Sequence, residues 1–167
     1  MESAVRDHIK EWILLKFPDA LLRDEMLYDF YTLTLRKEYL LPVIKWLYEN
    51  EKLRFRFLTT LCGLHYPQQE EELGMMYQLH SLENNYRIRL KTFFSTEEAE
   101  VPSMTGLFSC ANWMERETYD FFGIRFTGHP DLRRILNVDD MIIYPLRKEY
   151  PLEDQTRTDK QDAMFGR

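Results

Sequence analysis

The stretch NWMERETYDFFGIRFTGHPDLRRIL, residues 112–136, decides how the rest of this chain is interpreted. Its first half predicts a helix that ends at Phe122, because no Gly or Pro interrupts residues 108–122 and Gly123 suits the position just after a helix. Ser109 is placed to act as the N-cap. At 100° per residue, one face of this helix is apolar. That face is formed by Cys110, Ala111, Met114, Thr118, Phe121 and Phe122.

The opposite face of the predicted helix is charged. Arg116 and Asp120 are spaced i,i+4 and are expected to pair, with Trp113 beside them. Glu115 and Glu117 lie at the borders between the two faces, where we expect them to hold basic side chains. The candidates for those basic partners are Arg125, Arg133 and Arg134. An aromatic residue next to paired charges is more typical of a protein-docking surface than of bare solvent.

Two motifs in this region resemble those of a known family. The first is ERE at 115–117 followed by DFF at 120–122, His129, and Arg133 with Ile135 and Leu136. The second is YPLRKEYPL at 144–152, in which Tyr144 and Glu149 stand where the family's HPLRKDYPL has His and Asp. Together they resemble the C subunit, or thirty-kilodalton subunit, of respiratory complex I, the NADH:quinone oxidoreductase.

The resemblance implies a non-catalytic subunit in the peripheral arm of that proton-translocating complex, which passes electrons from NADH through iron–sulfur clusters to quinone. The chain would support the quinone-binding module beside the D and B subunits, on the cytoplasmic side of the cell inner membrane. FMN, the iron–sulfur clusters and quinone would belong to partner subunits, and this chain would hold no cofactor and no metal. Related subunits occur in membrane-bound hydrogenases and in a coenzyme-F420 dehydrogenase, which are the alternatives.

The charged face of the predicted helix, its possible basic partners and the two motifs together give the residues expected at subunit interfaces or in a structural motif. They are Trp113, Glu115, Arg116, Glu117, Asp120, His129, Arg133, Arg134, Pro145, Arg147, Lys148, Tyr150 and Pro151. None of them is expected to be catalytic, to bind a cofactor or to ligate a metal.

Composition agrees with a soluble domain whose membrane contact comes only through partners. The chain has 167 residues, 44% of them hydrophobic and 30% charged, as in ordinary globular proteins. Its net charge of −6 argues against non-specific nucleic-acid binding. No apolar run approaches the roughly 18–20 residues needed to span a bilayer, and the N-terminus MESAVRDHIKEW is too polar for a signal peptide.

Hydrophobic periodicity predicts an α+β fold. Helices are expected at 2–17 and 39–49 in addition to the one that ends at Phe122, and strands at 30–36, 54–61, 75–82 and 86–92. Asn84-Asn85 suits a tight hairpin turn between the last two strands. We therefore expect a small mixed or antiparallel sheet of about four strands, covered by helices.

The chain is predicted to divide into an α+β core domain, residues 1–122, and a long extended C-terminal arm, residues 123–167. The arm is rich in apolar side chains, yet its prolines and glycines leave few helical or strand periods. Such a segment is expected to dock on a partner subunit. The rival interpretation is that the arm wraps back over its own sheet.

An independent metal hydrolase using Glu115, Glu117 and Asp120 is the alternative from another functional class. It is disfavoured because the two glutamates point about 160° apart on a helix. His129 as a general base would need a carboxylate neighbour.

The basic outer face of residues 86–92 is interpreted as a solvated sheet face rather than a nucleic-acid surface. His65 with the glutamates at 70–72 is interpreted as a charged loop tip rather than a metal site. Two other residues, Cys62 and Cys110, are expected to be buried, inert thiols.

Overall fold

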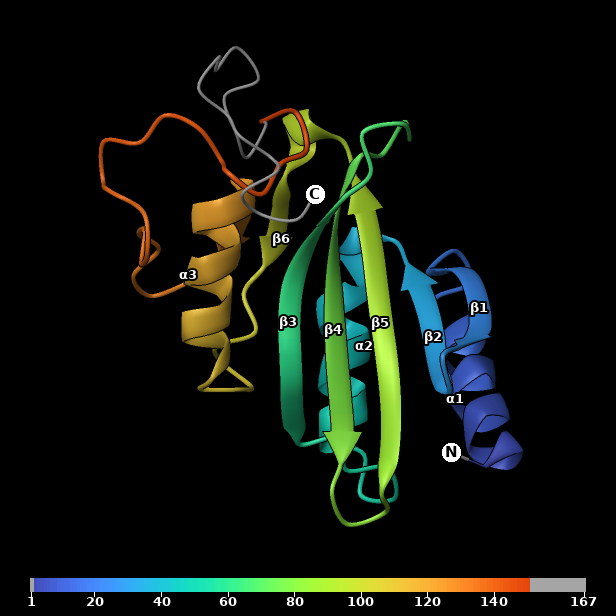
Figure 1. The fold of residues 1–167 in the computed structure, drawn as a ribbon. Helices are drawn as coiled ribbons and strands as arrows, with labels where there is room; N and C mark the ends of the chain where they lie inside the picture. The colour runs from blue at the N-terminus through green and yellow to red at the C-terminus, as the bar shows by residue number, and fades with distance from the viewer. Residues whose placement is uncertain (1, 151–167) are drawn as a thin grey trace, which may run out of the picture.

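The computed structural model describes residues 2–150, and its main feature is a five-stranded mixed sheet (Figure 1). The strands follow the order β1-β2-β5-β4-β3; β2 and β5 are parallel and the other neighbours antiparallel. The strands of this sheet are β1 (Leu21–Leu27), β2 (Phe30–Leu35), β3 (Phe57–His65), β4 (Leu73–Ser81) and β5 (Tyr86–Phe94). The helices are α1 (Ser3–Lys16), α2 (Leu40–Glu49), α3 (Ala111–Phe122) and the short η1 (Lys37–Tyr39) and η2 (Thr96–Glu98).

The predicted α+β class is confirmed, but the sheet has one more strand than expected. Strand β1 was missed because Arg23, Asp24 and Glu25 interrupt its apolar alternation. It pairs with β2 through a turn in which Tyr28 and Asp29 adopt positive φ angles of 49° and 64°. A second, two-stranded parallel sheet of β6 (Glu100–Pro102) and β7 (Arg125–Thr127) was also missed, since three residues are too few to show a period.

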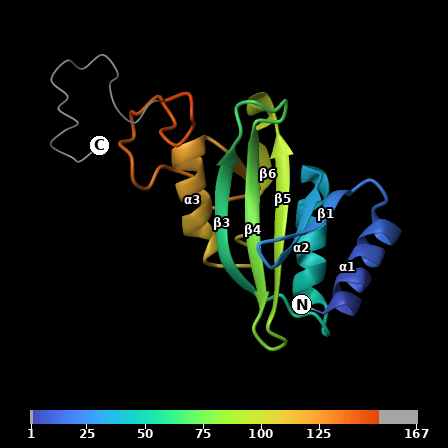
Figure 2. The same cartoon turned by 45° about the vertical axis from the view of Figure 1, so that its right-hand side comes forward.

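Helices α1 and α2 cover one face of the five-stranded sheet, and α3 lies beside β3 at its edge (Figures 1 and 2). The two covering helices are joined by the stacked rings of Trp12 and Trp46, whose centroids are 3.9 Å apart. Beneath them the core includes fully buried side chains from α1, α2 and the central strands. Examples are Ile13, Ile44, Leu33, Tyr77 and Leu90.

Most predicted element boundaries agree with the structure. The Asn84-Asn85 hairpin is confirmed, with Asn85 at φ 53° between β4 and β5. The predicted Ser109 cap is wrong, because Cys110 is the N-cap residue of α3 and no side chain caps the helix. Both Cys62 and Cys110 are half-buried free thiols rather than fully buried ones.

Within residues 2–150, no helix combines the length and apolarity needed to cross a membrane.

A candidate docking site built on helix α3

Two carboxylates of α3, Glu115 and Asp120, are buried. The Glu115 side chain is fully buried and accepts hydrogen bonds from Ser103 Oγ at 2.7 Å and from the Met104 amide at 2.6 Å. Burial raises the pKa of Glu115 to about 7, although these two hydrogen bonds act to lower it. The expectation that Glu115 holds a basic side chain is wrong, because α3 turns this residue toward the 103–105 loop instead of the surface.

Asp120 is also fully buried, and its partner is Arg134 rather than Arg116. Arg134 Nη1 donates to Asp120 Oδ1 at 2.8 Å, and the Asn137 side chain donates to the same oxygen at 3.0 Å. The other oxygen, Oδ2, accepts the three successive amides of residues 135–137 at 2.8–3.1 Å. Burial alone would raise the pKa of Asp120, but the hydrogen bonds from Asn137, Leu136 and Arg134 outweigh it and hold that pKa well below its ordinary range.

Arg116 binds the opposite side of the same turn. Its guanidinium donates to the carbonyl oxygens of Arg133 and Arg134 at 3.2 and 3.1 Å, and its Cζ lies 5.4 Å from the Trp113 ring centroid. The predicted pair of Arg116 with Asp120 is therefore wrong. The i,i+4 spacing does put the two groups on one face of α3, but the 133–137 turn offers amides to the carboxylate and carbonyls to the guanidinium. We call this turn the clamped turn.

Residues 144–150 return to the C-terminal end of α3. The guanidinium carbons of Arg134 and Arg147 lie 5.3 and 4.8 Å from the Tyr144 ring centroid. Arg147 Nε donates to Phe122 O at 2.8 Å, and the Lys148 amide donates to His65 Nδ1 at 2.9 Å. The described part of the predicted arm is thus bonded to its own domain. Its docking on a partner subunit, and the division at residue 122, stay predictions.

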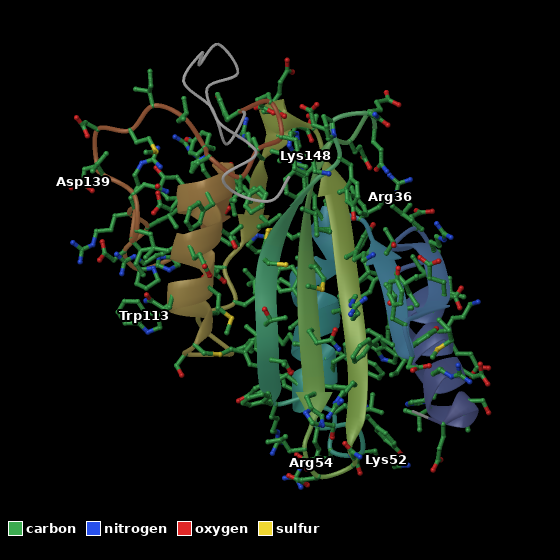
Figure 3. The ribbon with its side chains drawn as sticks, in the orientation of Figure 1. Arg36, Lys52, Arg54, Trp113, Asp139 and Lys148 are labelled. Atoms are coloured by element: carbon green, nitrogen blue, oxygen red, sulfur yellow. The ribbon has the colours of Figure 1, made fainter. Side chains whose placement is uncertain are left out.

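The other predicted site residues lie around these contacts. Trp113 projects outward from α3 and is 61% exposed (Figure 3). Glu117 is exposed, and Arg133 is exposed and pairs with Asp131 at 2.9 Å. Pro145 and Tyr150, also in the set, are half-buried. Pro151 lies outside the described residues.

His129 is engaged by main-chain groups through both ring nitrogens. Its Nε2 donates to Asn112 O at 3.2 Å, and its Nδ1 accepts the Asp131 amide at 3.0 Å. It therefore links the start of α3 to the 129–131 turn. Glu115 and Asp120 are likewise committed to separate partners, and within residues 2–150 no three His, Cys, Asp or Glu side chains converge as metal ligands. The arrangement favours holding surfaces together over acid–base chemistry.

Sequence reasoning missed Ser103, the partner of Glu115, and the contact between Gly123 and Tyr144. Gly123 has a φ of 73°, and a Cβ atom there would lie 2.5 Å from the Tyr144 ring. The prediction that this glycine terminates the helix is confirmed. Its second role is to let an aromatic ring lie directly on the backbone, and no local pattern signals that.

Gly123→Ala should therefore lower the free energy of unfolding by about 1–3 kcal/mol, since it combines a left-handed backbone with a clash against Tyr144. The matched control is Gly106→Ala, because nothing lies within 4 Å of a Cβ at that position. Urea denaturation of the purified chain measures both. Equal stability of the two variants would contradict the packing of Tyr144 on Gly123.

The fold is an α+β domain whose helix α3 carries this carboxylate–arginine cluster, and comparison with known proteins gives the family. Residues 33–156 match the family described as respiratory-chain NADH dehydrogenase, 30 Kd subunit. The chain is 40% identical over 160 residues to the C subunit of the NADH-quinone oxidoreductase of Roseiflexus sp. (strain RS-1), covering 95% of this chain and 92% of the relative. It is 40% identical over 142 residues to the corresponding protein of Citrifermentans bemidjiense, which has the same name, covering 85% of this chain and 87% of the relative.

Two solved structures are also similar. One is a trypsin-resistant fragment of Nqo5, with a TM-score of 0.65 and 27% identity over 76% of this chain and 98% of that one. The other belongs to an archaeal membrane-bound sulfane sulfur reductase, with a TM-score of 0.71 and 22% identity over 88% of this chain and 86% of that one, and it shows the fold alone. The chain belongs to the 30 kDa subunit family of respiratory-chain NADH dehydrogenase. This membership makes it a peripheral-arm subunit of complex I and does not favour the hydrogenase and F420 alternatives.

Proposed function

We propose that this chain is a non-catalytic subunit that uses the α3 side of the domain to support the quinone-binding module of its complex. The D and B subunits are the proposed neighbours, on the cytoplasmic side of the inner membrane. FMN, the iron–sulfur clusters and quinone are assigned to other chains. Membrane contact then comes only through the assembled complex.

The observation that carries this proposal is the exposure of large apolar side chains in the clamped turn and in the segment that follows it. Ile142 is 92% exposed, and Leu136, Val138 and Leu146 are also substantially exposed. Trp113 extends the apolar surface onto α3 itself. Apolar side chains gathered along one segment, next to arginines, are typical of a protein–protein interface.

The contacts beneath this surface explain why such a segment keeps its shape before it meets a partner. Asp120 and Arg116 fix the clamped turn from opposite sides, and Arg147 fixes the segment that follows Tyr144. A surface that is already ordered loses less conformational entropy on binding. The buried charges of α3 therefore serve to present the apolar residues rather than to contact the partner themselves.

Ile142→Asp should reduce the amount of this chain that co-purifies with its complex by about tenfold or more, because an interface would lose a buried Ile and gain a charge. The isolated variant should fold normally, since Ile142 is almost fully exposed. The control is Leu15→Asp on α1, which is 79% exposed on the opposite side of the domain (Figure 1). Co-purification of the Ile142 variant at the level of the wild type would contradict the proposed docking surface.

A further inference from the structure

The face of the sheet opposite α1 and α2 is covered by no described helix (Figures 1 and 2). Along β5, the buried residues Ile88 and Leu90 face the covering helices, so Arg87, Arg89 and Lys91 face the other way. The pairing register shows which residues of the neighbouring strands lie on this same face. Arg89 lies opposite Gln78 on β4 and Lys91 opposite Met76, while Cys62 on β3 extends the row from Met76. We call this surface the open face.

The open face is strongly cationic for a chain of net charge −6. Its basic residues are Arg23, Arg87, Arg89 and Lys91. Among the described strand residues of this face, the one acidic residue is Glu25, which pairs with Arg23 at 2.8 Å. Glu117 of α3 lies near Cys62 at the β3 edge. No described carboxylate lies within 4.0 Å of Arg87 or Lys91.

These cations are crowded together. Partial burial lowers the pKa of Lys91, and the neighbouring Arg89 and Arg23 lower it further, with Glu25 opposing them. Arg89 is held in place because its Nε donates to Gln78 Oε1 at 3.1 Å and its guanidinium carbon lies 4.7 Å from the Phe30 ring centroid. Like charges held side by side cost free energy in the isolated chain. An acidic surface placed over them would remove that cost.

Beside the cations of the central strand β5, the side of the open face toward β4 and β3 is less polar. Met76 and Cys62 are half-buried there, Phe93 is half-buried on β5, and Phe57 is exposed at one end. Gln78 is buried, and its Nε2 has no hydrogen-bond partner among the described residues. Met and aromatic side chains next to arginines match the composition of protein interfaces.

We propose that the open face binds an acidic surface on another protein of the assembly, at a second docking site distinct from the α3 side. The occupant places Asp or Glu side chains against Arg87 and Lys91 and apolar side chains against the row of Met76 and Cys62. A protein is favoured over nucleic acid because the chain carries a net negative charge and one of the aromatic rings, Phe30, is already covered by Arg89. The proposal rests on membership in a complex of several subunits and not on the α3 site, which Ile142→Asp tests separately.

The test uses the assembled complex. Zero-length carbodiimide coupling should join the Lys91 amine to an Asp or Glu of a different subunit, and a small amine-labelling reagent should modify Lys91 several-fold less in the complex than in the free full-length chain. The double variant R87E/K91E should lower incorporation of the chain into the complex by about tenfold. The control, K16E/K52E, makes the same change of charge on α1 and at the end of the sheet, and should assemble normally (Figure 3).

Three results would overturn the proposal. One is equal labelling of Lys91 in the free chain and in the complex. Another is incorporation of R87E/K91E at the level of K16E/K52E. The third is binding of the free chain to phosphatidylglycerol vesicles that is lost in R87E/K91E while incorporation into the complex is kept, which would assign the open face to anionic lipid instead.

Discussion

Asp120→Asn should lower the free energy of unfolding of the isolated chain by about 3–5 kcal/mol, the cost of removing one partner of a buried ion pair. The variant keeps the size of the side chain but leaves Arg134, which is only 10% exposed, without its carboxylate. It also replaces an oxygen that accepts hydrogen bonds with an amide that faces donors from residues 135–137. We therefore expect the clamped turn to detach from α3.

Urea denaturation and limited proteolysis of residues 133–150 measure this effect. The control is Asp131→Asn, because Asp131 forms an exposed ion pair with Arg133 whose loss should cost no more than about 1 kcal/mol. Equal stability of the two variants would show that the clamped turn does not depend on Asp120.

Asp120 also makes the stability of the folded chain depend on pH. The pKa of Asp120 is depressed in the folded chain, so its stabilising contribution is fully present above the unfolded pKa of about 3.9 and is lost as pH falls below that value toward the folded pKa. Asp120→Asn should remove this part of the acid dependence.

Glu115 affects stability in the opposite sense to Asp120, and Glu115→Gln should remove that effect. Because burial raises the folded pKa of Glu115 to about 7, the folded chain binds a proton between roughly pH 4.5 and 7 that the unfolded chain has lost. The wild type therefore loses stability as pH rises through this window, by an amount on the order of 3 kcal/mol by pH 8. Glutamine stays neutral and can still accept the Met104 amide, so the variant should show a flatter profile and greater stability at pH 8.

Denaturation of both proteins at pH 5 and pH 8 is the measurement. Glu117→Gln is the matched control on the same helix, because it makes the same substitution at an exposed position. Parallel profiles for the wild type and Glu115→Gln would contradict the burial of an ionisable carboxyl group between α3 and Ser103.

The elements that were predicted correctly are those with a clear local pattern in the sequence. The alternation from Tyr86 to Thr92 predicted β5, and Gly123 marked the end of α3 because a glycine tolerates its left-handed conformation. Strand β1 was not predicted, since its side chains do not alternate between apolar and charged. Its place in the sheet comes from pairing with β2, which is a tertiary contact rather than a local preference.

Several of the motif residues contact one another in the structure, but their hydrogen-bond partners were not predicted. Helical spacing records only which residues of α3 share a face, and so it favoured Arg116 as the partner of Asp120. The actual partners come from residues 133–137, whose path after Gly128 leaves no periodic signal. Burial of Glu115 was missed for a related reason, because hydropathy places a charged residue outside unless its hydrogen-bond partners are known.

The central claim is that this chain supports assembly without taking part in the reaction, and NADH:quinone reductase turnover per assembled complex tests it most directly. The measurement compares wild type, Ile142→Asp and Asp120→Asn, with the amount of complex normalised to its bound flavin. We expect the two variants to lower the amount of assembled complex while turnover per flavin in the remaining complex stays at the wild-type value. Normal amounts of complex with turnover per flavin reduced tenfold or more would contradict the claim and place a residue of this chain in the reaction itself.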